Sequence, residues 1–204
     1  MELVLVRCGE TEAPPGVLLG QSALPLSASG FAALERLAAG WIGPPPRLLF
    51  CSDLRRAQQG AKVLAARFSI DPLADARLRA LDLGQWNGGN FGMIAVEQSR
   101  AWSRWNADWI SGAPPGGESW IELTVRVRGW LAGLTASDMP GRGEQRIVAL
   151  THESTLRALL AEVLELAPLA ARRLRFDPAF VSAIRLDRGH FEVSYLNAPL
   201  FLPP

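Results

Sequence analysis

Short apolar runs alternate along the chain with longer segments in which apolar residues recur at helical spacing. Three runs, at residues 2–7, 47–51 and 146–151, are almost continuously apolar. Such runs are typical of strands that are covered on both faces within a parallel sheet. A polar loop or turn follows each run, and a segment with helical periodicity comes next. These segments predict helices at residues 27–39, from about 53 to 68 and from about 153 to 166.

The remaining segments carry weaker signals. Residues 74–83 predict a short strand, and the glycine-rich residues 84–92 predict a loop. The tail from 180 to 196 alternates as a hairpin does, with its turn at 187–189. Helical spacing also occurs on either side of a proline- and glycine-rich interruption, at residues 94–110 and 119–134.

This alternation predicts an α/β fold, a three-layer α/β/α sandwich with a mostly parallel sheet. We expect one domain over residues 1–204, with a helical insert at about residues 86–125 that covers the site. Open sheets of this kind bind ligands beyond the carboxyl ends of their strands. The side chains that follow the predicted strands at that edge are Arg7, Cys8, Ser52 and His152.

The composition is that of a globular domain and excludes several classes of partner. Hydrophobic residues make up 49% of the chain, charged residues make up 20%, and the formal net charge is +1. So small a charge gives no field that would attract nucleic acid or an anionic membrane. No apolar run approaches the ~18 residues of a membrane-spanning helix, and the first residues do not resemble an export signal. We therefore expect no nucleic-acid partner and no membrane.

The two cysteines, Cys8 and Cys51, are too few for a secreted disulfide framework and predict a reducing, cytoplasmic location. Cys51 is interpreted as a buried, inert thiol, although the first two strands are expected to be neighbours, which would let Cys8 and Cys51 approach each other. Two histidines and two cysteines form no spaced ligand set, so no metal and no cofactor are expected. His190, beside the hairpin turn, is expected on the surface.

Five short blocks carry the candidate chemistry. In chain order they are Arg7-Cys8-Gly9-Glu10-Thr11, Ser52-Asp53-Leu54-Arg55-Arg56-Ala57, Arg77-Leu78-Arg79-Ala80-Leu81-Asp82-Leu83-Gly84-Gln85-Trp86, Pro115-Gly116-Gly117-Glu118-Ser119 and Thr151-His152-Glu153-Ser154-Thr155-Leu156-Arg157. One block alone would be a weak signal, whereas five in order span nearly the whole chain. Together they resemble the phosphoglycerate mutase-like, α-ribazole phosphatase-like branch of the histidine phosphatase superfamily.

The resemblance implies a phosphate pocket. In that family two arginines and a second histidine bind a phosphoryl group, a first histidine attacks phosphorus and becomes phosphohistidine, and a glutamate protonates the departing alcohol. The matching phosphate-binding positions here are Arg7, Arg56 and His152, together with Thr11 of the first block. Guanidinium groups suit this task because their permanently protonated donors match the oxygens of a phosphoryl group in transfer.

Both reacting groups of the family are absent from their positions. Cys8 stands at the position of the nucleophilic histidine, and Ala80 stands at the position of the acid glutamate. A thiol ionises at about pH 8.5, and flanking arginines favour the thiolate, so Cys8 is a candidate nucleophile. The Cys-x5-Arg loop of the cysteine phosphatases is not present, because the sixth residue after Cys8 is Pro14.

A carboxyl group from elsewhere can replace the missing acid. Glu153 directly follows His152, where another branch of the superfamily carries its donor carboxylate; Asp82 and Glu118 are further candidates. The alternative for Glu153 is a structural role, because a carboxylate is favoured at the start of a helix.

Three functions follow from these residues. The first is a protein of this family that binds a phosphomonoester, a phosphorylated small molecule, with impaired or lost hydrolysis. The second is an active phosphomonoesterase, of the α-ribazole phosphate or sugar phosphate type, that uses Cys8 or a relocated acid. The third is a noncatalytic scaffold whose partner binds exposed tryptophans. Trp102, Trp105 and Trp109 recur at helical spacing and predict one stripe of indoles, for which packing of an amphipathic helix is the favoured interpretation. The sequence carries no signal for an oligomeric state.

Overall fold

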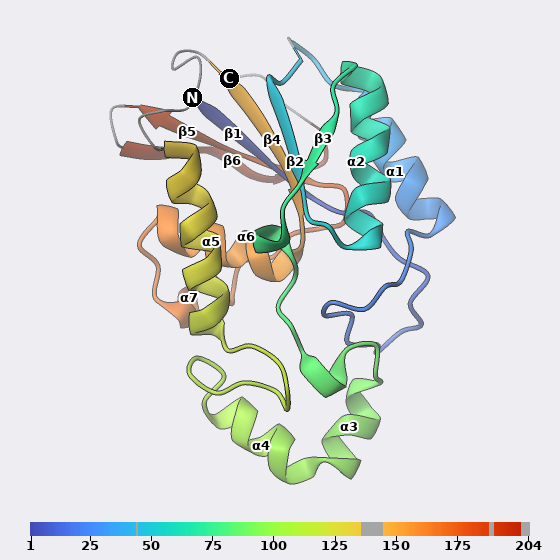
Figure 1. Cartoon of the computed structure of the whole chain (residues 1–204), viewed down its shortest axis with the longest axis vertical. Helices are drawn as coiled ribbons and strands as arrows, with labels where there is room; N and C mark the ends of the chain where they lie inside the picture. The colour runs from blue at the N-terminus through green and yellow to red at the C-terminus, as the bar shows by residue number, and fades with distance from the viewer. Residues whose placement is uncertain (44, 136–144, 188–189, 201–204) are drawn as a thin grey trace.

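A computed structural model describes residues 1–43, 45–135, 145–187 and 190–200. It contains one six-stranded sheet with the order β3-β2-β4-β1-β5-β6 (Figure 1). The strands are β1 (Glu2–Arg7), β2 (Leu48–Cys51), β3 (Pro72–Ala74), β4 (Arg146–Thr151), β5 (Val181–Asp187) and β6 (His190–Ala198). The helices are α1 (Ala28–Ala39), α2 (Arg55–Phe68), α3 (Phe91–Glu97), α4 (Ser99–Ala107), α5 (Trp120–Thr135), α6 (Glu153–Val163) and α7 (Pro168–Ala171), with short 3-10 turns at Ala76–Leu78 and Gly84–Trp86.

The sheet is mixed, with a parallel core. Strand β4 pairs in parallel with β1 and with β2, and β2 pairs in parallel with β3. Strand β5 runs antiparallel to β1, and β6 returns antiparallel to β5. The α/β prediction with a mostly parallel sheet is confirmed, and so are the two strands of the tail hairpin. Arg188 and Gly189 of the expected turn lie outside the described residues.

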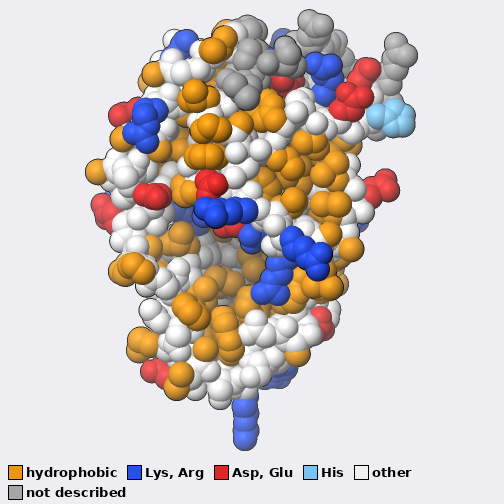
Figure 2. Space-filling model, turned by 180° about the vertical axis from the view of Figure 1, so that it is seen from behind, with side chains coloured by type: hydrophobic (Ala, Val, Ile, Leu, Met, Phe, Trp, Pro, Cys, Tyr) orange, Lys and Arg blue, Asp and Glu red, His pale blue; other side chains and the backbone are white. Residues whose placement is uncertain are grey.

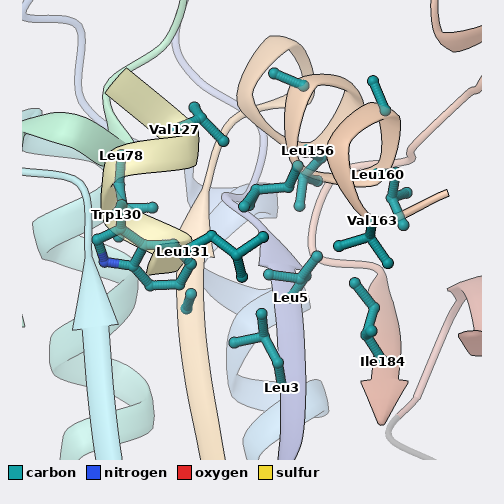
Figure 3. Packing of buried hydrophobic residues seen from close by; sticks show 14 of the residues in the cluster. Leu3, Leu5, Leu78, Val127, Trp130, Leu131, Leu156, Leu160, Val163 and Ile184 are labelled. Atoms are coloured by element: carbon teal, nitrogen blue, oxygen red, sulfur yellow. The ribbon is translucent and has the colours of Figure 1, made fainter. Parts of the chain in front are cut away.

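The side chains of the central strands alternate between two hydrophobic cores. Leu3 and Leu5 of β1 pack with α5 and α6, as Figure 3 shows for the neighbourhood of Trp130. Val4 and Val6 point to the other face and pack with α1 and α2. The side chains on both faces of a central parallel strand are buried, so the sequence of such a strand is a continuous apolar run. The helices on the two faces and the sheet between them form three layers, and the candidate site lies at one edge of these layers.

Two expected elements differ from the structure. The strand expected within 74–83 ends at Ala74, because Asp75 accepts a hydrogen bond from the Arg77 backbone N–H and starts a 3-10 turn. The helix expected at 94–110 is two helices that break at Gln98. There the Gln98 side chain accepts a hydrogen bond of 2.8 Å from the buried Trp86 indole. A tertiary contact therefore interrupts a segment whose local pattern is helical.

The predicted tryptophan stripe is wrong for Trp109, whereas packing is confirmed for Trp102 and Trp105. Trp102 and Trp105 pack against Trp86, with ring centroids 5.4 and 5.7 Å away. Trp109 lies beyond the end of α4 and packs against Trp120 instead. Every tryptophan of the chain is described, and each is buried or half-buried. The exposed indoles that the scaffold hypothesis needs are absent, and Trp86, Trp102 and Trp105 fill a small core of their own with Leu83 and Ile94.

The loop after β1 is held against α1 by a contact between two glycines. A Cβ atom at Gly9 would lie 2.5 Å from the Gly30 carbonyl oxygen, and one at Gly30 would collide with the Glu10 backbone. We expect Gly30→Ala to lower the free energy of unfolding by about 1–3 kcal/mol, as overpacking does. Urea denaturation measures the change.

Gly129→Ala is the matched control, because a Cβ atom at Gly129 meets nothing within 4 Å and the residue lies inside α5. It should raise the unfolding free energy by about 0.5–1 kcal/mol through helix propensity. Equal effects of the two substitutions would contradict the close approach at Gly30.

Candidate functional site

The carboxyl ends of β1 and β4 bring Cys8 and His152 together. Arg7 is paired with Thr151 in the parallel register, and the Cys8 backbone N–H donates to the Thr151 carbonyl at 2.8 Å. The Cys8 Sγ atom then lies 3.4 Å from His152 Nδ1. Both side chains are buried, with 6% of Cys8 and 4% of His152 exposed. Sheet topology alone has thus joined residues that are 144 positions apart.

Arg56 enters the same site from the first turn of α2. Only 2% of this residue is exposed. Its guanidinium donates to the Gly20 carbonyl at 2.6 Å and to the Ser22 carbonyl at 2.9 Å. No carboxylate forms an ion pair with it among the described residues. Burial lowers the pKa of Arg56 from its ordinary value, but arginine remains charged in proteins. The site therefore contains a buried cation without a counter-ion.

Arg7 is the second guanidinium of the site. It donates to the Phe176 carbonyl and lies 3.3 Å from a Glu153 carboxylate oxygen. The other Glu153 oxygen is 2.5 Å from Arg157, one helical turn further along α6. Two arginines share this one carboxylate. Together with unpaired Arg56, they leave the site with an excess of positive charge.

Ala80 lies beside the turn that carries His152. The Thr151 hydroxyl donates to the Leu78 carbonyl at 2.7 Å, and the Thr155 hydroxyl donates to the Arg79 carbonyl at 2.6 Å. The Leu81 backbone N–H donates to Ser154 Oγ at 2.9 Å. Hydrogen bonds from both sides of His152 therefore fix the backbone at position 80. The side chain there is a methyl group, 7% exposed.

Two residues that the sequence analysis did not assign to the site hold the Ala80 carbonyl. Arg126 of α5 donates to it at 2.9 Å, and Gln21 donates through its amide at 3.1 Å. Arg126 also binds both carboxylate oxygens of Glu118, at 2.5 and 2.9 Å. Glu118 precedes α5 by two residues and Arg126 lies within it, so this pair belongs to one stretch of chain, whereas only the fold brings Ala80 to the same guanidinium.

Burial keeps both central groups of the site uncharged. It raises the pKa of the Cys8 thiol, and the opposing effects of Arg56 and Arg7 are smaller. It also holds the pKa of His152 well below its ordinary value, with Arg56, Arg126 and Arg7 acting in the same direction. At neutral pH the pair is a thiol next to a neutral imidazole. The thiolate that flanking arginines were expected to favour is opposed by the loss of solvent around Cys8.

One ring nitrogen of His152 has no partner within the described part of the chain. Nδ1 faces the Cys8 thiol, whereas Nε2 is buried and makes no hydrogen bond. Buried polar atoms normally find a partner, so an unpaired one indicates a site that is completed by a ligand or by water. Within the described residues, Nε2, the charge of Arg56 and the buried Ser22 hydroxyl next to Arg56 are left without a partner group.

The candidate acids are held by other contacts. Glu153 contacts Arg7 and Arg157, as described above. Glu118 is held by Arg126 and also accepts from the Asp82 backbone N–H at 2.8 Å. Asp82 accepts from the Gly84 backbone N–H and from the Asn87 amide. Each contact stabilises a carboxylate as a hydrogen-bond acceptor, which favours a structural role for all three.

The remaining candidates are Thr11, Ser52 and His190. The Thr11 hydroxyl accepts weakly from the Ala13 backbone N–H at 3.4 Å, within its own loop. The buried Ser52 hydroxyl accepts from the Leu54 backbone N–H at the start of α2. His190 is exposed, at the start of β6. None of their described hydrogen bonds reaches Cys8, Arg56 or His152.

Cys51 is not adjacent to Cys8, because β4 lies between β1 and β2. The two cysteines are therefore separated by two interstrand spacings, about 10 Å, whereas a disulfide requires Cα atoms within about 7 Å. The expectation that the first two strands are neighbours was wrong. Both thiols are free and buried, and burial together with Asp53 raises the pKa of Cys51 to about 11.

The surface view shows a hollow on the rear face of the molecule (Figure 2). Basic and acidic side chains lie along its upper rim, and hydrophobic side chains lie below them. Among the residues that the structure describes, no three His, Cys, Asp or Glu side chains gather as a metal site would require. No described helix is long and apolar enough to cross a membrane.

Comparisons with known proteins identify similar sequences and similar folds. The family model of the histidine phosphatase superfamily, branch 1, matches residues 3–199. The adenosylcobalamin/α-ribazole phosphatase of Escherichia coli K12 is 27% identical over 199 residues, which cover 97% of this chain and 96% of that protein. The crystal structure of the α-ribazole phosphatase from Shigella flexneri superposes with a TM-score of 0.91 at 25% identity and covers both chains fully, 100% of each. A mycobacterial glucosyl-3-phosphoglycerate phosphatase in complex with inorganic phosphate superposes with a TM-score of 0.82 at 28% identity, over 97% of each chain.

Proposed function

The chain belongs to branch 1 of the histidine phosphatase superfamily, and from this premise we propose that its pocket binds the phosphoryl group of a phosphorylated small molecule and does not hydrolyse it at an ordinary rate. Arg7, Arg56 and His152 bind the phosphoryl oxygens. The leaving group lies beyond them and determines which phosphomonoester is accepted.

The observation that carries the proposal is the uncompensated charge of Arg56. A buried guanidinium without a carboxylate partner is costly unless an anion binds to it. His152 Nε2, buried and unpaired, provides a further position for a ligand oxygen. The guanidinium groups of Arg7, Arg56 and Arg157 and the carboxylate of Glu153 leave a net positive charge, which matches the negative charge of a phosphomonoester dianion. The mycobacterial relative was crystallised with inorganic phosphate, which supports the same class of ligand here.

The proposed loss of hydrolysis has two physical causes. Cys8 is a thiol rather than a thiolate, because burial raises its pKa, and a bound phosphate dianion would oppose ionisation further. Ala80 provides no proton for the leaving alcohol, and Glu153 is engaged by Arg7 and Arg157. General acid catalysis contributes about 10²–10⁴ to such reactions, so its absence alone would slow turnover severely.

Cys8-dependent hydrolysis is the second candidate function. The 3.4 Å contact between Cys8 Sγ and His152 Nδ1 favours it, because a histidine at this distance can accept the proton of an attacking thiol. Sulfur would bond to phosphorus while the ester oxygen departs. Water would then release phosphate and regenerate the thiol.

Thermal unfolding with ligand, combined with an activity assay, separates these candidates. Inorganic phosphate at about 100 times its dissociation constant should stabilise the fold by about 2.7 kcal/mol and raise Tm by about 5–10 °C. Hydrolysis of p-nitrophenyl phosphate should not exceed that of a heat-inactivated sample. If phosphate does not raise Tm, the proposed binding is overturned. Turnover that Cys8→Ser removes would establish the second candidate instead.

A further inference from the structure

The two arginines of the site are in different electrostatic states. Arg56 forms no ion pair with a carboxylate in the described part of the chain, and only 2% of it is exposed. Arg7 donates to the Phe176 carbonyl, and its guanidinium lies 3.3 Å from a carboxylate oxygen of Glu153. The charge of Arg7 is therefore partly neutralised by the protein itself, whereas the charge of Arg56 is not.

Glu153 occupies a fixed place at the mouth of the site. It is the first residue of α6 and directly follows His152. A carboxylate is favoured in the first turn of a helix, which stabilises a glutamate there whether or not it contacts Arg7. The Glu153 side chain is 30% exposed and that of Arg7 is 24% exposed, so solvent reaches both groups. An anion that approaches Arg7 therefore meets the Glu153 carboxylate at the same guanidinium.

Arg157 provides a second partner for this carboxylate. Its guanidinium lies 2.5 Å from the other oxygen of Glu153, one turn further along α6. The Nε atom of Arg157 also donates to the Leu174 carbonyl at 2.8 Å, which anchors the guanidinium. If an anion takes over Arg7, Glu153 keeps Arg157 as its partner. The exchange therefore replaces one contact of Arg7 by another and leaves no half-buried carboxylate unpaired.

We propose that Glu153 competes with the ligand for Arg7, and that it thereby sets both the affinity of the pocket and the ligand charge that the pocket prefers. The inference rests on the proposed phosphate binding and deepens it. The repulsion between the Glu153 carboxylate and a bound anion grows in proportion to the charge of that anion. Glu153 therefore weakens the binding of a doubly charged phosphomonoester more than the binding of a singly charged phosphodiester.

Glu153→Gln tests the competition, because it removes the charge and keeps the size of the side chain. Methyl phosphate is a dianion at about pH 8, and calorimetric titration should show that the variant binds it at least about tenfold more tightly than the unmodified chain does. Glu153→Ala should show a gain in the same direction, and circular dichroism verifies that each variant is folded. If Glu153 instead holds Arg7 in position for the ligand, both variants bind methyl phosphate more weakly, which would overturn the inference.

Glu162→Gln is the matched control. Glu162 lies on the same helix and forms an ion pair with Arg128, so its substitution removes an equal charge from α6. The affinity for methyl phosphate should stay within about twofold of the unmodified value, because distant charges are screened. Equal gains in Glu153→Gln and Glu162→Gln would mean that net charge, and not the contact with Arg7, controls binding.

Dimethyl phosphate, which carries a single charge, separates charge competition from a change in the shape of the site. Halving the ligand charge halves its Coulomb energy with the carboxylate. A tenfold gain for methyl phosphate in Glu153→Gln therefore corresponds to a gain of only about threefold for dimethyl phosphate. Equal gains for the two ligands would refute the charge preference.

A double-mutant cycle tests the role of Arg157. Arg157→Met removes the second partner of Glu153 and should commit the carboxylate to Arg7. The resulting loss of methyl phosphate affinity should be at least about threefold larger in the chain with Glu153 than in the Glu153→Gln background. Equal losses in the two backgrounds would contradict the exchange of partners.

The same titrations distinguish failure of this inference from failure of the proposed function. If methyl phosphate binds neither the unmodified chain nor Glu153→Gln, the proposed function fails. If it binds the unmodified chain and Glu153→Gln does not bind it more tightly, the inference alone fails. Binding that appears only in Glu153→Gln would support the inference and would show that the carboxylate excludes the ligand from the unmodified chain.

Discussion

The double substitution Cys8→His with Ala80→Glu should convert the protein into a phosphatase, with kcat at least about a thousandfold above that of the unmodified chain. The substitutions restore a nucleophilic imidazole and a carboxyl group that can protonate the leaving oxygen. The backbone at position 80 is already fixed by hydrogen bonds from Thr155, Arg126 and Gln21 to neighbouring carbonyls. The introduced carboxyl group therefore enters a prepared position rather than a flexible loop.

Two substrates and two control variants make this result specific. With p-nitrophenyl phosphate, whose leaving group needs little protonation, Cys8→His alone should recover part of the activity. With an alkyl phosphate, activity should require both substitutions. The variant Cys8→His with Ala80→Gln has a neutral amide in place of the introduced carboxyl group. It should lose most of the gain in kcat on the alkyl phosphate. A folded, phosphate-binding double variant without activity would show that the pocket does not retain the catalytic geometry of its family.

Arg56→Met should reduce phosphate affinity at least about 100-fold, which is the second-largest effect that we expect. Charge-assisted hydrogen bonds contribute about 1.5–3 kcal/mol each, and each 1.4 kcal/mol changes a dissociation constant tenfold. Arg56 is 2% exposed, so its interaction with an anion is weakly screened by solvent. Methionine keeps most of the buried volume, which limits the change in packing. Calorimetric titration with phosphate measures the loss.

Arg55→Met is the matched control for Arg56. Arg55 is the preceding residue of α2 and is exposed, so its substitution removes the same charge from nearly the same place in the chain. Its effect on phosphate affinity should stay within about threefold, because exposed charges are screened. Circular dichroism confirms that both variants are folded. Equal losses of affinity would mean that net charge, and not the buried guanidinium, attracts the anion.

Much of the candidate site follows from the order of motifs along the chain. Arg7, Cys8 and His152 were expected at strand ends, and the parallel register of β1 with β4 brings Cys8 to 3.4 Å from His152. Arg56 was expected from its place in the second motif. The chain could not reveal that Arg56 lacks a counter-ion, because that depends on which carboxylates the fold brings near it.

Other residues were misread because their environment is tertiary. Trp109 was expected on one helix stripe with Trp102 and Trp105, yet it lies beyond the end of α4 and packs against Trp120 from another segment. The strands of Cys8 and Cys51 were expected to be neighbours, which would let the two thiols approach each other, whereas β4 lies between these strands. Hydrophobic periodicity gives the face of an element but does not specify its neighbour.

The sequence by itself determined the alternation of buried strands and amphipathic helices, and it placed the polar groups of the site at the ends of those strands. These features are local, since each depends on spacing over a few residues. Only the tertiary structure decided their chemical state. Burial raises the pKa of Cys8 against the opposing effect of Arg56 and Arg7. Burial lowers the pKa of His152, and arginines from three different elements act in the same direction. Desolvation and charge depend on distances between remote segments, and no pattern along the chain contains them.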